Sequence, residues 1–266
     1  MPITTSTIDT AAYLTRIGYA GPLEPTVDTL RALHRAHLLA VLFENLDIHP
    51  PFHCEITLEL ERLEEKIVEA QRGGFCYELN GLFAALLETL GFNVTLLSAG
   101  VRRAEGGFGP AFDHLLLRVD VDGEAWLADV GFGDSFLEPI RLTDTMQHDV
   151  HGGTFRIDAE HEARGDGLIL RRLIHEDWEP QYRFRLAAYA LEDFAEMCRF
   201  QQSSPDSVFT RSRVCSRFTP TGRVSLTDTR LIVTEGRVRA EYPVEGDDAF
   251  LAALADHFGI APIVGK

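Results

Sequence analysis

The sequence predicts an α+β protein, because helical and strand-like segments follow one another in blocks and do not alternate. Up to Gly91 most segments carry apolar residues at helical spacing. Beyond Gly91 the segments are short, rich in Val and Leu, and separated by Asp-Gly and Gly-x-Gly turns. The end of the chain mixes both kinds of segment, so we expect helices first, then a sheet or barrel, then a mixed α/β part.

The first part is expected to hold four helices, at about residues 9–18, 26–41, 57–74 and 76–90. Thr7 or Asp9 can cap the first of them. The third runs up to the paired glycines at 73 and 74. The fourth is apolar on most sides, which predicts a central position.

The remaining segments read mainly as strands. They cover 93–103, 113–121, 124–133, 154–160, 168–175, 180–186 and 222–244, with helices expected at 191–202 and 247–258. Asp122-Gly123 predicts a tight hairpin turn, because both residue types tolerate positive φ.

Composition narrows the function classes. The chain has 266 residues, 45% of them apolar, and a formal net charge of −16, which indicates a globular protein and argues against nucleic-acid binding. The four cysteines form no C-x-x-C pair, which favours a reducing compartment. Neither a signal peptide nor an apolar run of membrane-spanning length is present, so we expect a cytoplasmic protein without a membrane partner.

Cys76 is the first candidate functional residue, because it stands where a helix is expected to begin. The unpaired N–H groups and the dipole at a helix start favour the thiolate, which is the reactive form of cysteine. Gly73 and Gly74 remove side chains before it, so that a bulky electrophile could approach. A buried structural cysteine after a glycine turn is the alternative.

A nucleophilic cysteine needs a base and a group that orients the base. If Val121–Glu124 is the hairpin turn, residues whose numbers sum to about 245 face each other. His114 then lies opposite position 131, and Asp129 lies two places away on the same face. The register therefore predicts that His114 and Asp129 meet.

Other catalytic and metal motifs are absent. The chain has no G-x-S-x-G, no G-x-x-x-x-G-K-[ST] and no H-E-x-x-H. His34 with His37, and His148 with His151, have the spacing of metal ligands, but no third ligand is near. We expect these histidines to be solvated and the protein to have no metal site.

Five segments together resemble one family, the arylamine N-acetyltransferases. They occur in order between about residues 40 and 210 and read FENLDIH, RGGFCYELNG, FDHLLL, DVGFG and SPDSVF. The resemblance implies an N-terminal helical bundle (1–92), a central β-barrel (93–197) and a C-terminal α/β lid (198–266), with a catalytic core like that of papain-type cysteine proteases. It also implies a monomer or homodimer.

The resemblance implies an activity as well. Acetyl-coenzyme A would be the acyl-donor substrate, with no permanently bound cofactor, and an arylamine, hydrazine or arylhydroxylamine would be the acceptor in xenobiotic metabolism. Cys76 would be the nucleophile, His114 its base and Asp129 the orienting group in a ping-pong reaction.

The same resemblance assigns binding residues. It places Phe43, Phe132 and Phe209 in the acceptor pocket and Gly131 beside the path of the cofactor. Two positions depart from the pattern: the family commonly has proline where this chain has Leu42, and a small polar residue where it has Asp113. A carboxylate beside His114 is expected to affect acceptor preference or the pKa of the histidine.

Three alternative functions remain to be weighed, two that use the same triad and one that does not need it. An amide synthase that closes an antibiotic macrolactam would use this triad on a tethered substrate. A cysteine peptidase would hydrolyse the acyl-enzyme with water. A non-catalytic binding protein would not need all three residues, so the complete set argues against it.

Overall fold

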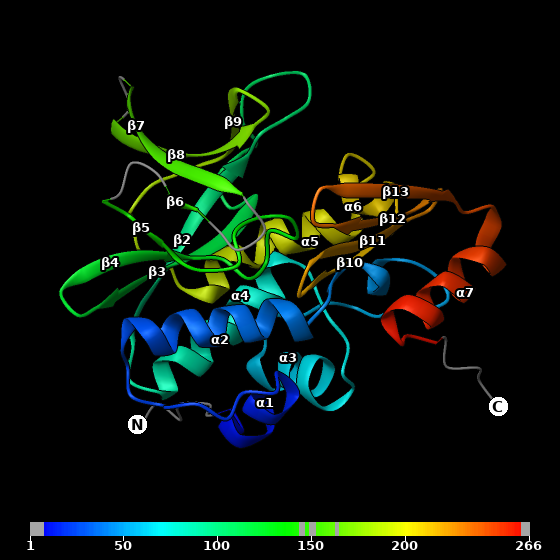
Figure 1. Cartoon of the computed structure of the whole chain (residues 1–266), viewed down its shortest axis with the longest axis horizontal. Coiled ribbons are helices and arrows are strands. Elements are labelled where there is room, and N and C mark those ends of the chain that lie inside the picture. The colour runs from blue at the N-terminus through cyan, green and yellow to red at the C-terminus, as the bar shows by residue number, and fades with distance from the viewer. Residues whose placement is uncertain (1–7, 144–146, 149–152, 163–164, 262–266) are drawn as a thin grey trace.

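The structure is a computed structural model that describes residues 8–143, 147–148, 153–162 and 165–261 (Figure 1). Its helices are α1 (Thr10–Arg16), α2 (Val27–Ala40), α3 (Leu60–Glu64), α4 (Cys76–Thr89), α5 (Ala195–Ser203), α6 (Val208–Arg211) and α7 (Gly246–Phe258). Short 3-10 turns lie at η1 (Leu46–Ile48) and η3 (Leu191–Phe194), and a π-helical turn lies at η2 (Glu65–Glu69). The predicted α+β class is confirmed.

The N-terminal helices pack around α4, which is central as expected, and eleven of its fourteen residues are buried. Asp9 caps α1 by accepting a hydrogen bond from the Ala12 N–H (2.9 Å), whereas Thr7 lies outside the described residues. The predicted helix at 57–74 is wrong at both ends, because α3 begins at Leu60 and the π turn stops at Glu69. The backbone of Ile56 instead pairs at 3.0 Å with the side chain of Gln202, which holds the segment before α3 extended.

Eight antiparallel strands form a curled sheet in the order β5-β4-β3-β2-β9-β8-β7-β6. They are β2 (Asn93–Val101), β3 (His114–Val121), β4 (Glu124–Ala128), β5 (Ile140–Arg141), β6 (Gln147–His148), β7 (Thr154–Glu162), β8 (Gly165–Ile174) and β9 (Asp177–Phe184). The sheet forms only part of the predicted central β-barrel: in the part of the chain described, the two-residue end strands β5 and β6 do not pair with each other, and the sheet stays open. A core that includes Leu97, Leu116 and Phe155 fills the curl.

The β3–β4 hairpin has the predicted register. Val121 pairs with Glu124, and the ladder continues to Leu117 opposite Ala128, so paired residue numbers sum to 245. Asp122 and Gly123 adopt φ values of 54° and 75°. This tight turn fixes which residues of the two strands face each other.

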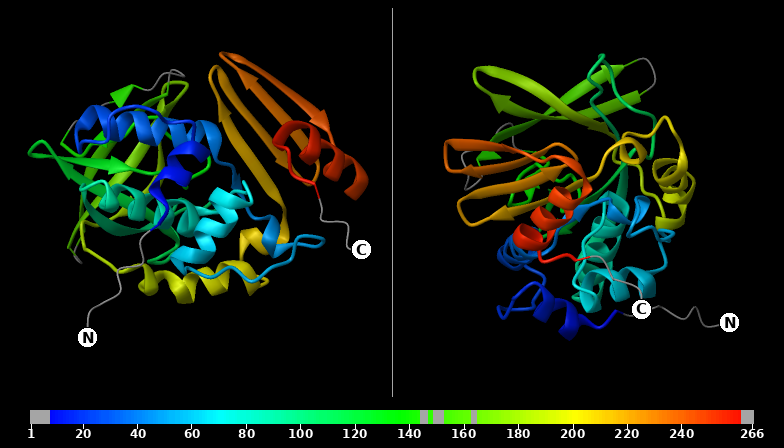
Figure 2. Two further views of the ribbon diagram at one scale, coloured as in Figure 1. Left: turned by 90° about the horizontal axis from the view of Figure 1, so that it is seen from below. Right: turned by 90° about the vertical axis from the view of Figure 1, so that its right-hand side faces the viewer.

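A second sheet has the order β1-β10-β11-β12-β13 and packs against α7 (Figure 2). Its strands are β1 (Phe43–Glu44), β10 (Val214–Thr219), β11 (Gly222–Thr227), β12 (Arg230–Glu235) and β13 (Val238–Pro243). The edge strand β1 comes from the N-terminal part, and Phe43 pairs with Ser216. Leu42 is 2% exposed and packs into the core beneath this sheet.

No helix among the described residues is long and apolar enough to cross a membrane. The cytoplasmic location and the lack of a membrane partner stay predictions.

Candidate active site

Cys76 is the first residue of α4 and is only 3% exposed. Phe75 precedes it in an extended conformation and is the N-cap of the helix. The helix is 14 residues long, and the dipole at its start favours an anion at Cys76. The structure thus places this cysteine as the sequence predicts.

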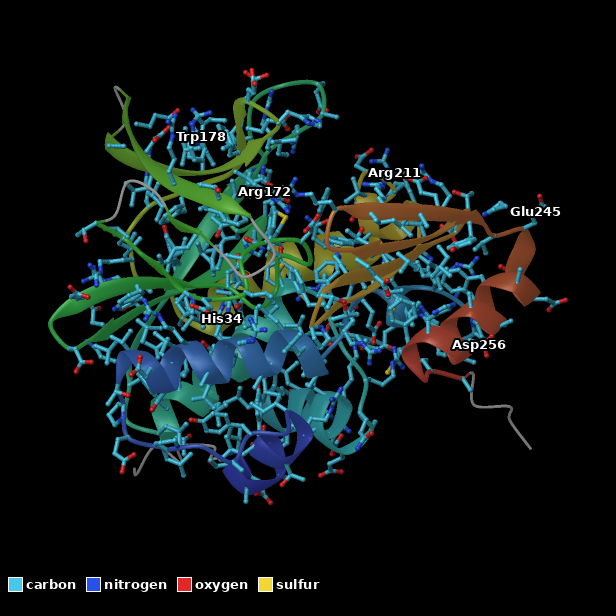
Figure 3. All side chains as sticks on the ribbon, viewed as in Figure 1. His34, Arg172, Trp178, Arg211, Glu245 and Asp256 are labelled. Atoms are coloured by element: carbon cyan, nitrogen blue, oxygen red, sulfur yellow. The ribbon has the colours of Figure 1, made fainter. Side chains whose placement is uncertain are left out.

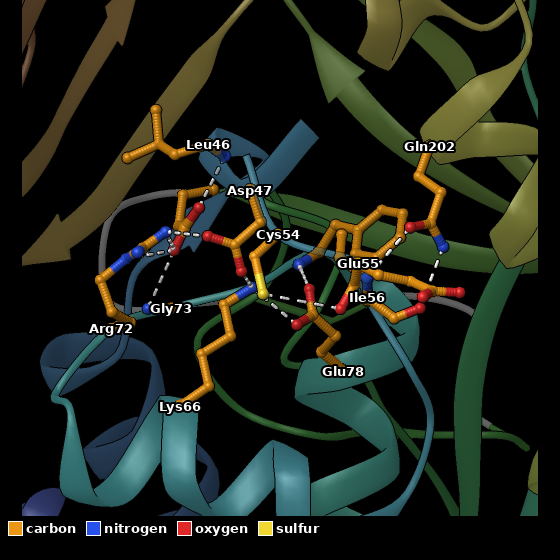
Figure 4. A network of polar contacts seen from close by, with 12 residues as sticks. Leu46, Asp47, Cys54, Glu55, Ile56, Lys66, Arg72, Gly73, Glu78 and Gln202 are labelled. Carbon is orange, nitrogen blue, oxygen red and sulfur yellow. Dashed lines mark hydrogen bonds and ion pairs between the residues drawn. The ribbon is translucent and has the colours of Figure 1, made fainter. Parts of the chain in front are cut away.

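A buried ionic network holds the start of α4 (Figure 4). Glu78 accepts a hydrogen bond from the Phe75 N–H (3.1 Å) and lies 2.7 Å from the Lys66 ammonium, which also contacts Asp47 at 2.9 Å. Burial raises the pKa of Glu78 to about 7 although Lys66 opposes the shift. The sequence analysis missed this network, although Lys66 is one of only two lysines in the chain.

The same network continues to the chain just before Cys76. The Arg72 guanidinium contacts Glu44 and Asp47 at 2.8 Å, and Glu44 also accepts a hydrogen bond from the Gly73 N–H (3.3 Å). Residues 72–75 are therefore held by groups from β1, η1 and η2 at once.

The two glycines before Cys76 serve a different purpose from the expected one. A Cβ on Gly73 would stand 2.1 Å from the Leu42 carbonyl oxygen, and one on Gly74 would stand 2.7 Å from the Glu78 carboxylate. Both positions require glycine because neighbouring chain lies too close for a side chain. The interpretation that they leave room for a substrate is wrong.

His114 and Asp129 meet as the hairpin register predicts. His114 Nε2 lies 2.8 Å from Asp129 Oδ2, and both residues are buried. Burial lowers the pKa of His114, but the Asp129 charge and hydrogen bonds with Asp129 and Cys76 outweigh it and raise the pKa to about 10. Because the Nε2–H of His114 donates to Asp129, Nδ1 is the ring nitrogen left for the hydrogen bond with Cys76.

Asp129 is held by further hydrogen bonds that the sequence analysis missed. Its Oδ1 accepts from Asn80 Nδ2 (2.9 Å) and from the Gly131 N–H (3.0 Å). Burial raises the pKa of Asp129, but His114 and these donors outweigh it and hold the pKa below its usual value. Asn80 lies one helical turn after Cys76, on the same face of α4. A lone amide in an apolar helix was the sequence signal that could have identified it as part of the site.

Gly131 lies against the first turn of α4. A Cβ at this position would stand 2.7 Å from Cys76 Cα and 2.6 Å from Asn80 Nδ2. Only glycine lets the loop after β4 approach the cysteine this closely. Its predicted position beside the path of the cofactor stays a prediction.

His34 reaches the same loop from α2 (Figure 3). Its Nε2 accepts a hydrogen bond from the Asp129 N–H (3.1 Å), and its Nδ1–H donates to the Leu137 carbonyl (2.9 Å). Burial lowers the pKa of His34 to about 4, so the ring is neutral. The expectation that His34 and His37 are solvated is wrong, because both are fully buried and α2 packs its polar rings inward.

The three predicted pocket phenylalanines are all partly exposed. The rings of Phe43 and Phe209 have centroids 6.3 Å apart, and Phe132 packs edge-on against His114 at 5.2 Å. Phe43 also contacts the loop of Phe132, since a Cβ on Gly133 would lie 3.0 Å from its ring. The structure therefore places Phe132 against His114, Phe43 against the loop of Phe132, and Phe209 beside Phe43.

Within the described ranges, no three His, Cys, Asp or Glu residues are grouped so as to hold a metal ion. His151 and the side chain of His148 lie outside those ranges.

Residues 26–262 match the N-acetyltransferase protein family. The chain is 36% identical over 251 residues to the arylamine N-acetyltransferase of Escherichia coli strain K12, covering 93% of this chain and 87% of that protein. The chain belongs to the arylamine N-acetyltransferase family. The expected family membership is confirmed.

Solved structures of the family have the same fold. The Salmonella typhimurium arylamine N-acetyltransferase superposes with a TM-score of 0.86 at 35% identity, over 94% of this chain and 90% of that one. The Mycobacterium marinum enzyme in complex with CoA has a TM-score of 0.85 at 31% identity, over 95% and 93%.

Protonation of His34 should destabilise the protein in acid. The folded pKa of about 4 lies below the usual 6.5, so its contribution is complete above pH 6.5 and is lost as the pH falls toward 4. One such group changes the free energy of unfolding by up to about 1.4 kcal/mol per pH unit. We expect the free energy of unfolding of His34→Gln, measured by urea denaturation, to fall less steeply between pH 6.5 and 4.5 than that of the wild type.

The exposed His257 provides a matched control. His257→Gln should keep the wild-type slope. An unchanged slope in His34→Gln would contradict the neutral buried state of His34.

Proposed function

We propose that this protein transfers an acetyl group from acetyl-coenzyme A to the nitrogen of an arylamine, hydrazine or arylhydroxylamine through an acetylated Cys76. Family membership supports the reaction class. The observation that carries the assignment of residues is the 2.8 Å contact of His114 Nε2 with Asp129, which leaves Nδ1 facing the cysteine at a helix start. This plan resembles that of papain-type cysteine proteases.

In the first half-reaction, the Cys76 thiolate attacks the thioester carbonyl and N–H groups at the start of α4 stabilise the oxyanion. The bond from carbonyl carbon to coenzyme A sulfur breaks, and the imidazolium of His114 gives its Nδ1 proton to the departing thiolate. The products are acetyl-Cys76, free coenzyme A and a neutral imidazole.

In the second half-reaction, the amine attacks acetyl-Cys76. His114 takes one proton from the attacking nitrogen as the bond to Cys76 breaks. The acetylated amine leaves, and the thiolate and imidazolium return. Asp129 holds the ring in the required tautomer through both halves.

We also assign the acceptor site to the rings of Phe43, Phe132 and Phe209. The three rings are partly exposed and that of Phe132 packs against His114, which suits a flat aromatic amine that can stack on them. Gly131 would border the cofactor path, since its backbone lies against Cys76.

The three-part division at 1–92, 93–197 and 198–266 remains our proposal for the domains. The end of α4 and the beginning of β2 support the first boundary. The macrolactam-forming alternative is not favoured, because the relatives that match across most of the chain are arylamine N-acetyltransferases.

Initial rates should show a ping-pong pattern. If Cys76 carries the acetyl group, coenzyme A leaves before the amine reacts, and double-reciprocal plots at varied amine are parallel. Without amine, mixing with acetyl-coenzyme A should release a burst of about one coenzyme A per active site. Intersecting lines, no burst and an active Cys76→Ser variant would instead indicate direct transfer in a ternary complex.

Asp129→Asn should keep the fold and lower kcat by roughly a thousandfold or more, because the amide favours the wrong imidazole tautomer. Circular dichroism and turnover of the purified variant measure the two effects. A folded variant that keeps more than about a tenth of wild-type turnover would rule out the orienting role.

Cys76 should react first with sub-stoichiometric iodoacetamide, although Cys54 is the exposed cysteine. Reactivity follows the thiolate, and His114 stabilises that form only at Cys76. Burial raises the pKa of Cys198 and Cys215, so these thiols should react last. Peptide mapping measures the order, and Cys54→Ser serves as the control. Preferential labelling of Cys54 with full activity retained would contradict the assignment.

A further inference from the structure

Asp113, the residue before His114, joins the curled sheet to α5. Its Oδ2 accepts a hydrogen bond from the Val101 N–H of β2 (3.2 Å), and its Oδ1 accepts from Gln201 Nε2 (2.8 Å). Both carboxylate oxygens are therefore acceptors. The site described above does not use this carboxylate.

The hydrogen bonds continue from Gln201 to the backbone of Phe209. Gln201 Oε1 accepts from the Ser207 hydroxyl (2.6 Å), and both residues are buried. Ser207 Oγ in turn accepts from the Phe209 N–H (3.1 Å) at the N-cap of α6. We call Asp113, Gln201 and Ser207 the Asp113 relay.

Phe209 is held from the other side as well. Its carbonyl oxygen accepts hydrogen bonds from Asn45 Nδ2 (2.9 Å) and from His49 Nε2 (2.7 Å). Its ring packs edge-on against Phe75, with centroids 5.6 Å apart. The relay therefore fixes the backbone N–H of Phe209, and Asn45 and His49 fix its backbone carbonyl.

The direction of the relay follows from the carboxylate. Ionised Asp113 can only accept, so it orients the Gln201 amide with Nε2 toward itself and Oε1 toward Ser207. The Ser207 hydroxyl must then donate to Oε1, which leaves its lone pairs for the Phe209 N–H. An amide at position 113 would permit the reversed relay, in which the Ser207 hydrogen loses its acceptor.

We propose that Asp113 is a positioning residue that fixes Phe209 through this relay and thereby sets the preference for aromatic acceptors in the second half-reaction. The inference rests on the proposed acceptor site. It gives a physical role to one of the two residues expected to depart from the family's pattern, and the role is separate from the proton chemistry of His114.

Ping-pong kinetics separate the two half-reactions. The kcat/KM for acetyl-coenzyme A reports acetylation of Cys76, and the kcat/KM for the acceptor reports the second half alone. We expect Asp113→Asn and Gln201→Glu each to lower kcat/KM for 4-chloroaniline roughly tenfold, the loss that accompanies a broken hydrogen bond to a charged group. The values for hydrazine, which has no ring to stack, and for acetyl-coenzyme A should stay within about twofold of wild type.

The double variant Asp113→Asn/Gln201→Glu is the decisive measurement. Its asparagine can accept from the Val101 N–H and donate to the new glutamate, whose second oxygen accepts from Ser207, so the relay regains its direction and net charge. We expect the kcat/KM for 4-chloroaniline to return to within about threefold of wild type. Failure to recover in a folded double variant would overturn the inference.

Two further variants complete the test. Ser207→Ala keeps every charge and should show the same selective loss, so it replaces the single variants if these do not fold. Asp120→Asn removes a carboxylate from β3, the strand that follows Asp113, outside the relay and should leave all three constants unchanged. Equal losses for acetyl-coenzyme A and 4-chloroaniline in Asp113→Asn would show that it acts through His114, and this would also overturn the inference.

Phe209→Ala separates this inference from the proposed function. If it leaves kcat/KM for 4-chloroaniline unchanged, the acceptor site itself is wrong. If it lowers that constant while the relay variants do not, only the role of Asp113 is wrong.

Discussion

The buried carboxylate of Asp129 is the point on which the site depends. It receives hydrogen bonds from β3 through His114, from α4 through Asn80 and from its own loop through Gly131. A buried charge is costly unless its oxygens are fully occupied, so the fold that satisfies Asp129 must bring these three segments together. The contacts that satisfy the buried charge of Asp129 are thus the same contacts that hold the catalytic residues in place.

The surroundings of Asp129 extend that requirement to the helical part of the chain. His34 binds the Asp129 N–H only as a neutral ring, and its burial in α2 keeps it neutral. Two histidines near one aspartate therefore have opposite protonation states. The negative charge of Asp129 raises the pKa of His114. His34 instead hydrogen-bonds to backbone groups, and burial away from water lowers its pKa.

Sequence reasoning succeeded where the interactions are local. The turn at Asp122-Gly123 determines the β3–β4 register, so the meeting of His114 and Asp129 could be predicted from spacing. It failed where partners are distant in the chain: the inward position of His34 and the contact of Asn45 with Phe209 depend on tertiary packing. The central barrel was predicted only in part, because strand count and patterning do not reveal whether the end strands of the curled sheet pair with each other. Gly73 and Gly74 were correctly singled out for the wrong reason, since local sequence does not show which neighbour approaches.

The edge strand β1 has a consequence for biosynthesis. Phe43 pairs with Ser216 on one side and forms a bridge to Gly74, two residues before Cys76, on the other. During translation, the segment before Cys76 therefore cannot complete its contacts through β1 until β10 is made, more than a hundred residues later. Such long sequence separation slows folding and delays the final docking of β1 until most of the chain has left the ribosome. The site around the reactive cysteine thus forms late, after β3, which begins with His114, and the loop that holds Asp129 have been made.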